Sequence, residues 1–270
     1  GLGRYEDKIV KNRLVTERTP GIEDLAPTAV TGDHGLTLVE PAPFGVIGAI
    51  TPSTNPTSTI ICNAIGMLAA GNSVVFCVHP LAKRCSMETV ALLNEAITSA
   101  GGPPNLVTCL SHPSIETAQE VMHHPLIRLL VVTGGGAVVK AAMASGKRAI
   151  CAGPGNPPAV VDETAHLGKA GRDIVLGASA DNNIICVDEK EVLVIDRVAD
   201  ALIKAMEAAG AVVIDRSRLT ALENLVFATH PGPRGHGSMN LDLVGRNASV
   251  ILSRLGMNVP ESARLGIVEV

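Results

Sequence analysis

The sequence predicts an α/β fold in which helices cover both faces of a parallel sheet. Short apolar segments recur between residues 44 and 152, and segments of helical length lie between them. The apolar segments do not alternate with polar residues, which is typical of strands buried on both faces. Hydrophobic residues make up 46% of the chain but aromatic residues only 1%, so Val, Ile, Leu and Ala must build the core. Strands separated by helices form βαβ units, in which the strands run parallel.

A regular series of strands and helices is expected in the first part of the chain. The strands are residues 44–50, 73–78, 105–110, 127–133 and 148–152. The helices are residues 57–71, 82–100, 114–124 and 134–145. Gly71 ends the first helix, and the Gly-Gly-Pro-Pro segment at residues 101–104 ends the second. Polar, Gly-rich or Pro-rich segments follow every strand, and ligands bind at this edge of such sheets.

The pattern restarts after the "GPGNPP" segment at residues 153–158. Strands are expected at residues 159–162, 191–196, 211–214 and 264–270, with helices at residues 166–179, 197–210 and 248–256. We therefore predict two domains, residues 1–152 and residues 153–270. Because the chain stops on an apolar strand, we expect the second domain to be the N-terminal part of a larger one.

Composition and spacing argue against several classes of function. The net charge is −4 and no basic stripe is present, so we expect no nucleic-acid partner. No apolar run approaches the roughly 18 residues of a membrane span, so we expect none. The six cysteines are Cys62, Cys77, Cys85, Cys109, Cys151 and Cys186. None forms a CxxC pair, so we expect no metal site, and the lack of a signal peptide favours a reducing cytosol over disulfide bonds.

Two features at the predicted sheet edge could contact a cofactor. The segment "TGGGAVVK" at residues 133–140 places glycines at a helix N-terminus, where backbone N–H groups can bind a phosphate. It does not match GxGxxG, so a glycine turn that merely starts a helix is the simpler interpretation of the spacing. His79 ends a predicted strand and could contact a cofactor, although the spacing alone favours a half-exposed loop histidine.

Two further residues could carry catalysis. Asn55, in "TPSTNPT" at residues 51–57, can offer an amide N–H to a developing oxyanion, but the spacing alone favours a turn that caps the next helix. Cys186 follows the polar residues "DNN" and precedes "VDEKE", a setting in which an accessible thiolate could act as a nucleophile. The alternatives are that Cys186 begins a buried strand, or that Cys151, beside the "AGPG" loop, is the nucleophile.

Several segments together resemble the aldehyde dehydrogenase superfamily, and specifically its CoA-acylating branch of propionaldehyde and acetaldehyde dehydrogenases. They are "NRLVTERTPGIEDL", "PFGVIGAITPSTNPT", "MLAAGNSVVFCVHPLAK", "VVTGGGAVVKAAMASGK", "AGPGNPPAVVDETA" and "GASADNNIICVDEKEVLV". They span almost all of the chain in the expected order. The resemblance implies an internal part of a longer enzyme, with a Rossmann-type NAD-binding domain at residues 1–152 and the first part of a catalytic domain at residues 153–270.

The resemblance also implies which residues act. Cys186 matches the nucleophile, and Asn55 matches the asparagine that stabilises the oxyanion together with the backbone N–H of Cys186. The positions that match those holding NAD are Thr51, Pro52, Ser53, Thr54, His79, Pro80, Thr133, Gly134, Gly135, Val138 and Gly153. A short-chain aldehyde would form a thiohemiacetal on Cys186 and pass a hydride to NAD. Coenzyme A would then take the acyl group from the resulting thioester.

Position 152 favours coenzyme A over water as the acyl acceptor. Hydrolytic members of the superfamily carry a glutamate there that activates water, whereas this chain has Ala152. The rival hypotheses are a hydrolytic or glutamyl phosphate reductase-like member, and a catalytically incompetent fragment. Ala180 stands where the family usually has an aromatic residue, which implies a looser aldehyde pocket. We expect the full-length enzyme to be a homo-oligomer in the cytoplasm, where a bacterial microcompartment could house it.

Overall fold

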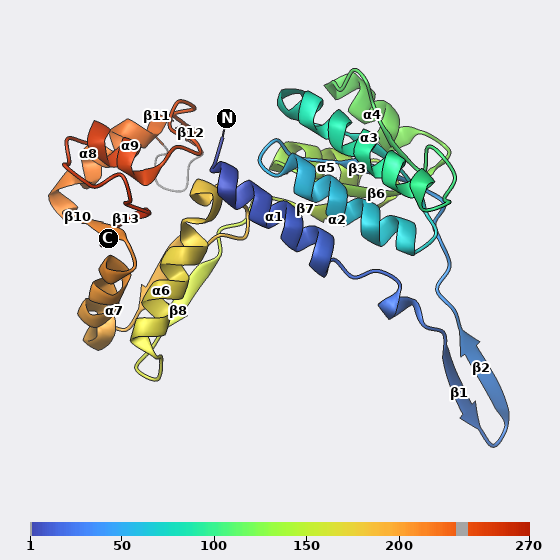
Figure 1. The fold of residues 1–270 in the computed structure, drawn as a ribbon, viewed down its shortest axis with the longest axis horizontal. Helices are drawn as coiled ribbons and strands as arrows, with labels where there is room; N and C mark the ends of the chain where they lie inside the picture. The colour runs from blue at the N-terminus through green and yellow to red at the C-terminus, as the bar shows by residue number, and fades with distance from the viewer. Residues whose placement is uncertain (1, 231–236) are drawn as a thin grey trace. The chain divides into compact units, whose positions relative to one another are not determined.

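The computed structural model describes residues 2–230 and 237–270, and Figure 1 shows its helices and strands. The chain divides into two compact units. We call Ile9–Pro154 the sheet unit, and Gly155–Val270 together with Gly1–Lys8 the cysteine unit. The first eight residues therefore group with the later part of the chain, although we had placed them with the sheet. The assignment of NAD binding to one unit and catalysis to the other stays a prediction.

A parallel sheet of five strands, in the order β5-β4-β3-β6-β7, forms the centre of the sheet unit. The strands are β3 (Val46–Ile50), β4 (Ser73–Cys77), β5 (Val107–Cys109), β6 (Ile127–Thr133) and β7 (Arg148–Ala152). Each falls within a segment that the sequence predicts as a strand. The α/β fold class is confirmed.

Helices cover both faces of this sheet (Figure 1). They are α2 (Pro56–Ala69), α3 (Lys83–Ser99), α4 (Ile115–His123) and α5 (Gly136–Ala144). Alternate residues of β3 serve the two cores, because Ile47 packs with α2 and α3 whereas Ile50 packs with α4 and α5. A Cβ at Gly48 would lie 2.8 Å from Cγ1 of Val121, so only glycine there lets α4 approach β3 this closely.

A helix and a hairpin precede the sheet. Helix α1 (Tyr5–Arg18) buries none of its residues. The short 3₁₀ helix η1 (Glu23–Leu25) leads to an antiparallel hairpin of β1 (Thr28–Gly32) and β2 (Gly35–Val39), in which every residue is exposed. Neither the helix nor the hairpin is among the elements that we predict from the sequence.

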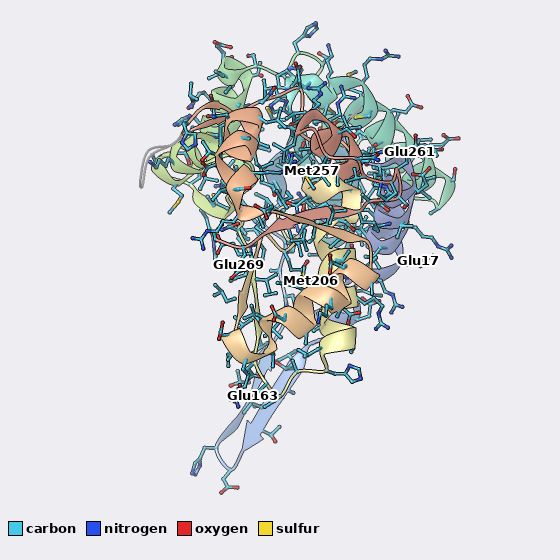
Figure 2. The ribbon with its side chains drawn as sticks, turned by 90° about the vertical axis from the view of Figure 1, so that its left-hand side faces the viewer. Glu17, Glu163, Met206, Met257, Glu261 and Glu269 are labelled. Carbon is cyan, nitrogen blue, oxygen red and sulfur yellow. The ribbon has the colours of Figure 1, made fainter. Side chains whose placement is uncertain are left out.

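The cysteine unit packs α6 against α7. Its elements are β8 (Pro158–Val161), α6 (Leu167–Ala178), β9 (Glu191–Val194), α7 (Asp196–Ala208), β10 (Ala211–Ile214), α8 (Leu219–Val226), β11 (Phe227–Thr229), β12 (Ser238–Met239), α9 (Ala248–Arg254) and β13 (Leu265–Val268). A Cβ at Gly171 of α6 would lie 2.7 Å from Cβ of Ala205, so the two helices are in close contact. Their core includes Val175, Leu202 and Met206, which Figure 2 labels on α7. Strands β8 and β9 pair in parallel, as do β10 and β13.

In the part of the chain that the structure describes, no helix is both long enough and apolar enough to cross a membrane. Nor do any three of its His, Cys, Asp or Glu side chains form a group that could hold a metal ion.

Candidate active site

Cys186 lies at the exposed corner of a tight turn between α6 and β9. Two hydrogen bonds close this turn: the Ile185 N–H donates to Oδ2 of Asp188 (3.1 Å), and the Asp188 N–H donates to the carbonyl oxygen of Ile185 (3.2 Å). Nζ of Lys190 donates to the same carbonyl at 3.1 Å and to that of Asp188 at 2.9 Å. The backbone on either side of the thiol is therefore fixed, and Cys186 does not begin a buried strand.

Two charged groups lie behind the turn. Asp188 is only 4% exposed, and burial raises the pKa of its carboxyl to about 6, although the Ile185 N–H and the Lys190 ammonium act in the opposite direction. Burial lowers the pKa of Lys190, while the negative charges of Asp188 and Cys186 raise it. The ammonium of Lys190 thus contacts the backbone on both sides of Cys186, at Ile185 and Asp188.

The three residues Asp181, Asn182 and Asn183 all have left-handed backbones, with φ of 47°, 58° and 60°. This conformation costs an L-residue about 1–2 kcal/mol, and Asn and Asp tolerate it better than most. The Asn183 side-chain amide stabilises the arrangement by donating to the carbonyl oxygens of Ala178 (2.6 Å) and Glu189 (3.0 Å). Strained backbone that its surroundings enforce is concentrated at functional sites, so the segment before Cys186 is a candidate for one.

Gly155 packs directly against the backbone of Cys186. A Cβ at Gly155 would lie 2.3 Å from the carbonyl oxygen of Cys186. Real Cβ atoms do not approach a backbone atom this closely, so any side chain at this position would displace the turn. The last glycine of the "GPG" segment is therefore required by its contact with the Cys186 turn rather than by flexibility of the loop.

In the sheet unit, the predicted cofactor residues follow neighbouring strands. Ile50 at the end of β3 pairs with Cys77 of β4 on one side and with Val132 of β6 on the other. The chain continues from β3 to β4 and β5 in one direction and places β6 and β7 in the other. The edge beyond β3 and β6 is therefore a topological switch point, which is where ligands bind to open parallel sheets.

Two observations at this edge fit a ligand. Thr51 is 2% exposed, and its buried hydroxyl oxygen has no hydrogen-bond partner among the described residues. Gly135 precedes α5 without a side-chain cap, and a Cβ at Gly135 or Gly136 would meet no atom within 4 Å. Because no side chain covers the first N–H groups of α5, a phosphate can approach them.

The remaining predicted cofactor residues lie near the same edge. Pro52, Ser53 and Thr54 follow β3, Pro80 follows His79 after β4, Thr133 ends β6, and Gly153 follows β7. Nδ1 of His79 accepts a hydrogen bond from the Leu81 N–H (3.2 Å), so His79 caps the short helix η2 (Pro80–Ala82). Val138 of α5 packs into the core below the turn, where a Cβ at Gly134 would lie 2.7 Å from its Cγ1. Contact of these residues with NAD stays a prediction.

Asn55 is buried at the start of α2 but does not cap it through its side chain. Its Oδ1 accepts a hydrogen bond of 2.5 Å from Nζ of Lys11, and its Nδ2 lies 3.5 Å from the hydroxyl oxygen of Thr54. The lysine thus directs the carbonyl side of the amide and leaves the N–H₂ side available as a donor. Asn55 belongs to the sheet unit and Cys186 to the cysteine unit, so their joint action is a proposal.

Sequence reasoning missed several residues of these sites. The sequence alone assigns no role to Asp188 and Lys190, although both stand in the "VDEKE" segment that follows Cys186. Gly155 is the last glycine of the "GPG" segment, and the sequence alone does not connect it with Cys186. The sequence could not show the partners of Lys11 or of Asp181, the first residue of "DNN", because those partners are distant in the sequence.

Comparison with known proteins identifies the family. A model of the aldehyde dehydrogenase family matches residues 15–216. An acetylating acetaldehyde dehydrogenase from Bilophila wadsworthia is 52% identical over 100% of this chain and 56% of that protein. A CoA-propanoylating propanal dehydrogenase from Salmonella typhimurium is 44% identical over 97% of this chain and 55% of that protein. The chain thus spans little more than half the length of these curated relatives.

Solved structures agree with this result. A propionaldehyde dehydrogenase from Rhodopseudomonas palustris with bound CoA and an acylated cysteine superposes with a TM-score of 0.92 at 51% identity, over 100% of this chain and 60% of that one. A propionaldehyde dehydrogenase from a fucose-utilisation microcompartment of Clostridium phytofermentans superposes with a TM-score of 0.92 at 48% identity, over 100% of this chain and 61% of that one. The chain belongs to the aldehyde dehydrogenase family.

Proposed function

We propose that the protein containing this chain is a CoA-acylating aldehyde dehydrogenase, which converts a short-chain aldehyde, NAD and coenzyme A into an acyl-CoA and NADH. The observation that carries this proposal is the exposed Cys186, held in a fixed turn with the Lys190 ammonium behind it. The relatives that are named acetylating or CoA-propanoylating support the choice of acceptor, since they match over nearly all of this chain.

Cys186 acts as the nucleophile in this proposal. Its thiolate attacks the aldehyde carbonyl, and the resulting thiohemiacetal oxygen is negatively charged. The Asn55 amide and the backbone N–H of Cys186 donate hydrogen bonds to that oxygen. NAD, when bound, accepts the hydride that leaves the carbon. The acyl group then remains on Cys186 as a thioester, which the thiol of coenzyme A attacks, and the Cys186 thiolate departs.

The edge of the sheet fits a dinucleotide. The unpaired, buried hydroxyl of Thr51 offers a hydrogen bond to a polar ligand, and the uncapped N-terminus of α5 at Gly135 suits a phosphate. We propose that Thr51, Pro52, Ser53, Thr54, His79, Pro80, Thr133, Gly134, Gly135, Val138 and Gly153 form the NAD site. Of these, Val138 acts through packing below the glycine turn.

The acyl acceptor follows from the chemistry near β7. Ala152 ends this strand and offers no carboxylate, so it cannot activate water as a general base. A thiol can attack as a thiolate and needs less help from a base. We therefore propose coenzyme A as the acceptor.

The experiment measures NADH formed from acetaldehyde or propionaldehyde by the intact protein, with and without coenzyme A. We expect NADH formation to depend on coenzyme A, with acyl-CoA in equal amount, and to disappear in Cys186→Ser. Equal NADH output without coenzyme A would overturn acyl transfer in favour of hydrolysis. Production of an acyl phosphate when inorganic phosphate replaces coenzyme A would indicate a phosphate-linked activity.

We also propose that the intact protein is a homo-oligomer in the cytoplasm, within a bacterial microcompartment. The β1–β2 hairpin supports the first point, because it exposes Val30, Leu36 and Leu38 by more than half. The microcompartment origin of the Clostridium phytofermentans relative supports the second. Sedimentation of the intact protein tests the oligomer, and its recovery with purified compartment shells tests the location.

A further inference from the structure

The segment that leads into Cys186 depends on residues from the beginning of the chain. Two side-chain amides support the left-handed residues Asp181–Asn183: that of Asn183 donates to the nearby carbonyl oxygen of Ala178, and that of Asn182 donates to the carbonyl oxygen of Gly245. The carboxylate of Asp181 contacts the start of α1, where it accepts hydrogen bonds from Arg4 and Lys8. All of these residues belong to the cysteine unit.

Asp181 is fully buried, at 0% exposure, and its contacts are charged or charge-assisted. Its Oδ1 accepts a hydrogen bond from the Arg4 N–H (2.7 Å), and its Oδ2 accepts one from Nζ of Lys8 (2.8 Å). Its own N–H donates to Oδ2 of Asp7 (2.9 Å). The carboxylate also lies at the N-terminus of α1, where the helix dipole favours a negative charge.

The fit between Asp181 and the start of the chain is tight. A Cβ at Gly3 would lie 2.0 Å from Oδ1 of Asp181, and Gly3 has a φ of +79° that favours glycine. Lys8 supplies a positive charge to this buried carboxylate, so its removal raises the free-energy cost of keeping Asp181 buried and favours exposure of Asp181 or rearrangement of its backbone. Either change would shift the backbone of Cys186. The reason is that the Asn183 amide binds the carbonyl oxygen of Glu189, which follows Cys186 in the chain.

We propose that Asp181 is a positioning residue for the Cys186 thiol. Lys8 and the Arg4 N–H hold its carboxylate, and Asp181 in turn fixes the backbone that orients the thiol. This inference rests on the proposed role of Cys186 as the nucleophile. Asp181 touches no reacting atom, and it acts through the left-handed turn. Its contribution therefore falls on the rate of the chemical step rather than on the binding of NAD in the sheet unit.

The test compares Lys8→Met and Asp181→Asn with the wild-type intact protein. Lys8→Met removes the cation while it keeps most of the side-chain length, and Asp181→Asn keeps an acceptor for the Arg4 N–H. We expect kcat to fall by about 10- to 100-fold, since displacement of a reacting group by about 1 Å has this effect. We expect KM for NAD to change by less than about twofold, and Lys8→Arg to restore most of kcat.

Lys169→Met is the matched control. It removes a lysine from another ion pair of the cysteine unit, with Asp173, but there both side chains are exposed, at 68% and 42%. We expect this variant to keep the wild-type kcat. A fall in kcat no larger for Lys8→Met than for Lys169→Met would overturn the proposal, as would a lower melting temperature with unchanged kcat.

Hydrogen exchange separates this inference from the proposed function. The amides of residues 181–188 should exchange at least about tenfold faster in Lys8→Met and Asp181→Asn than in the wild type or Lys169→Met. This comparison needs neither aldehyde nor coenzyme A. If the wild type makes no acyl-CoA, the proposed function fails while the exchange rates still decide whether Lys8 and Asp181 order the turn. Unchanged exchange in both variants would overturn the inference even in an active enzyme.

Discussion

At the scale of single residues, the cysteines differ in ways that composition could not show. Cys186 and Cys85 are exposed, whereas Cys77 is buried and Cys109 half-buried. Burial raises the pKa of the Cys77 thiol, and burial together with the charge of Cys77 raises the pKa of Cys109 to about 11. Since the thiolate is the reactive form, the latter two thiols are poor nucleophiles at neutral pH.

Alkylation with iodoacetamide at pH 8, followed by peptide mass spectrometry, should therefore label Cys186 and Cys85 and leave Cys77 and Cys109 unmodified. A pKa of about 11 leaves roughly one Cys109 thiol in a thousand ionised at this pH. Labelling of Cys109 as fast as that of Cys186 would contradict this prediction.

The buried carboxyl of Asp188 should make stability depend on pH. The unfolded carboxyl ionises near pH 4, whereas burial keeps the folded one protonated to about pH 6. The folded state thus binds more protons in this window, and stability falls as the pH rises through it. Relative to Asp188→Asn, the wild-type melting temperature should drop by on the order of 5 °C between pH 4 and pH 7.

Asp162→Asn serves as a control, because the pH dependence of stability that Asp162 contributes should have the opposite sign. Hydrogen bonds from the side chain and backbone of Thr164 lower the pKa of Asp162. The wild type should accordingly gain stability relative to Asp162→Asn as the pH rises through the range in which that carboxyl ionises. If the melting temperatures of the wild type and Asp188→Asn differ by the same amount at pH 4 and pH 7, the buried carboxyl of Asp188 does not cause the pH dependence of stability.

At the scale of elements, the contact of Gly155 with the Cys186 turn predicts a clear mutational contrast. With Cys186 as the proposed nucleophile, Gly155→Ala should reduce kcat at least about tenfold, because its Cβ would displace the carbonyl oxygen of Cys186, and small displacements of a reacting group are costly. Gly168→Ala in α6 should leave kcat unchanged, since its Cβ would make only an ordinary contact of 3.7 Å with His166. Wild-type kcat in Gly155→Ala would show that the turn tolerates displacement.

Among the elements, sequence reasoning succeeds for the central sheet and fails for helix α1 and the β1–β2 hairpin. The strands of the central sheet could be predicted because their apolar runs are bounded by glycine, proline and polar residues, as between β6 and α5. Helix α1 could not be predicted from a buried face, because none of its residues is buried. The β1–β2 hairpin lacks the alternation of a half-buried ribbon, since all of its residues are exposed.

The candidate site was predictable in part for a related reason. Cys186, Asn55 and the glycines before α5 carry chemistry in their residue types, so their order in the chain could be compared with that of a family. Two lysines of an exposed helix contact residues of the candidate site: Lys11 binds Asn55, and Lys8 binds Asp181 in the segment before Cys186. Neither lysine carries a signal of this role in the sequence. Only the fold brings them to their partners, across 44 and 173 residues of sequence respectively.

At the scale of the whole molecule, the division into two units predicts how NAD should affect the chain. A ligand that binds only the native state stabilises the part that holds it, by about 2.7 kcal/mol at a concentration one hundred times its dissociation constant. Added NAD should slow hydrogen exchange in the segment after β3 and in the first turn of α5. It should leave the amides of the α6–α7 core unchanged, because Val175 and Met206 belong to the cysteine unit.

Exchange measured by mass spectrometry with and without NAD checks this prediction, and adenosine alone serves as a weaker-binding comparison. Protection confined to the cysteine unit would contradict the assignment of the NAD site to the sheet edge. So would the absence of protection anywhere at saturating NAD.

The hydrogen bond between Arg4 and Asp181 has a consequence for synthesis of the protein on the ribosome. These residues are 177 positions apart, and everything that forms the central sheet is translated between them. Domains tend to fold as they emerge, N-terminal first, so the sheet can form while the start of α1 still lacks its partner. The thiol of Cys186 therefore acquires its final setting late in translation, when the sheet unit has already been synthesised.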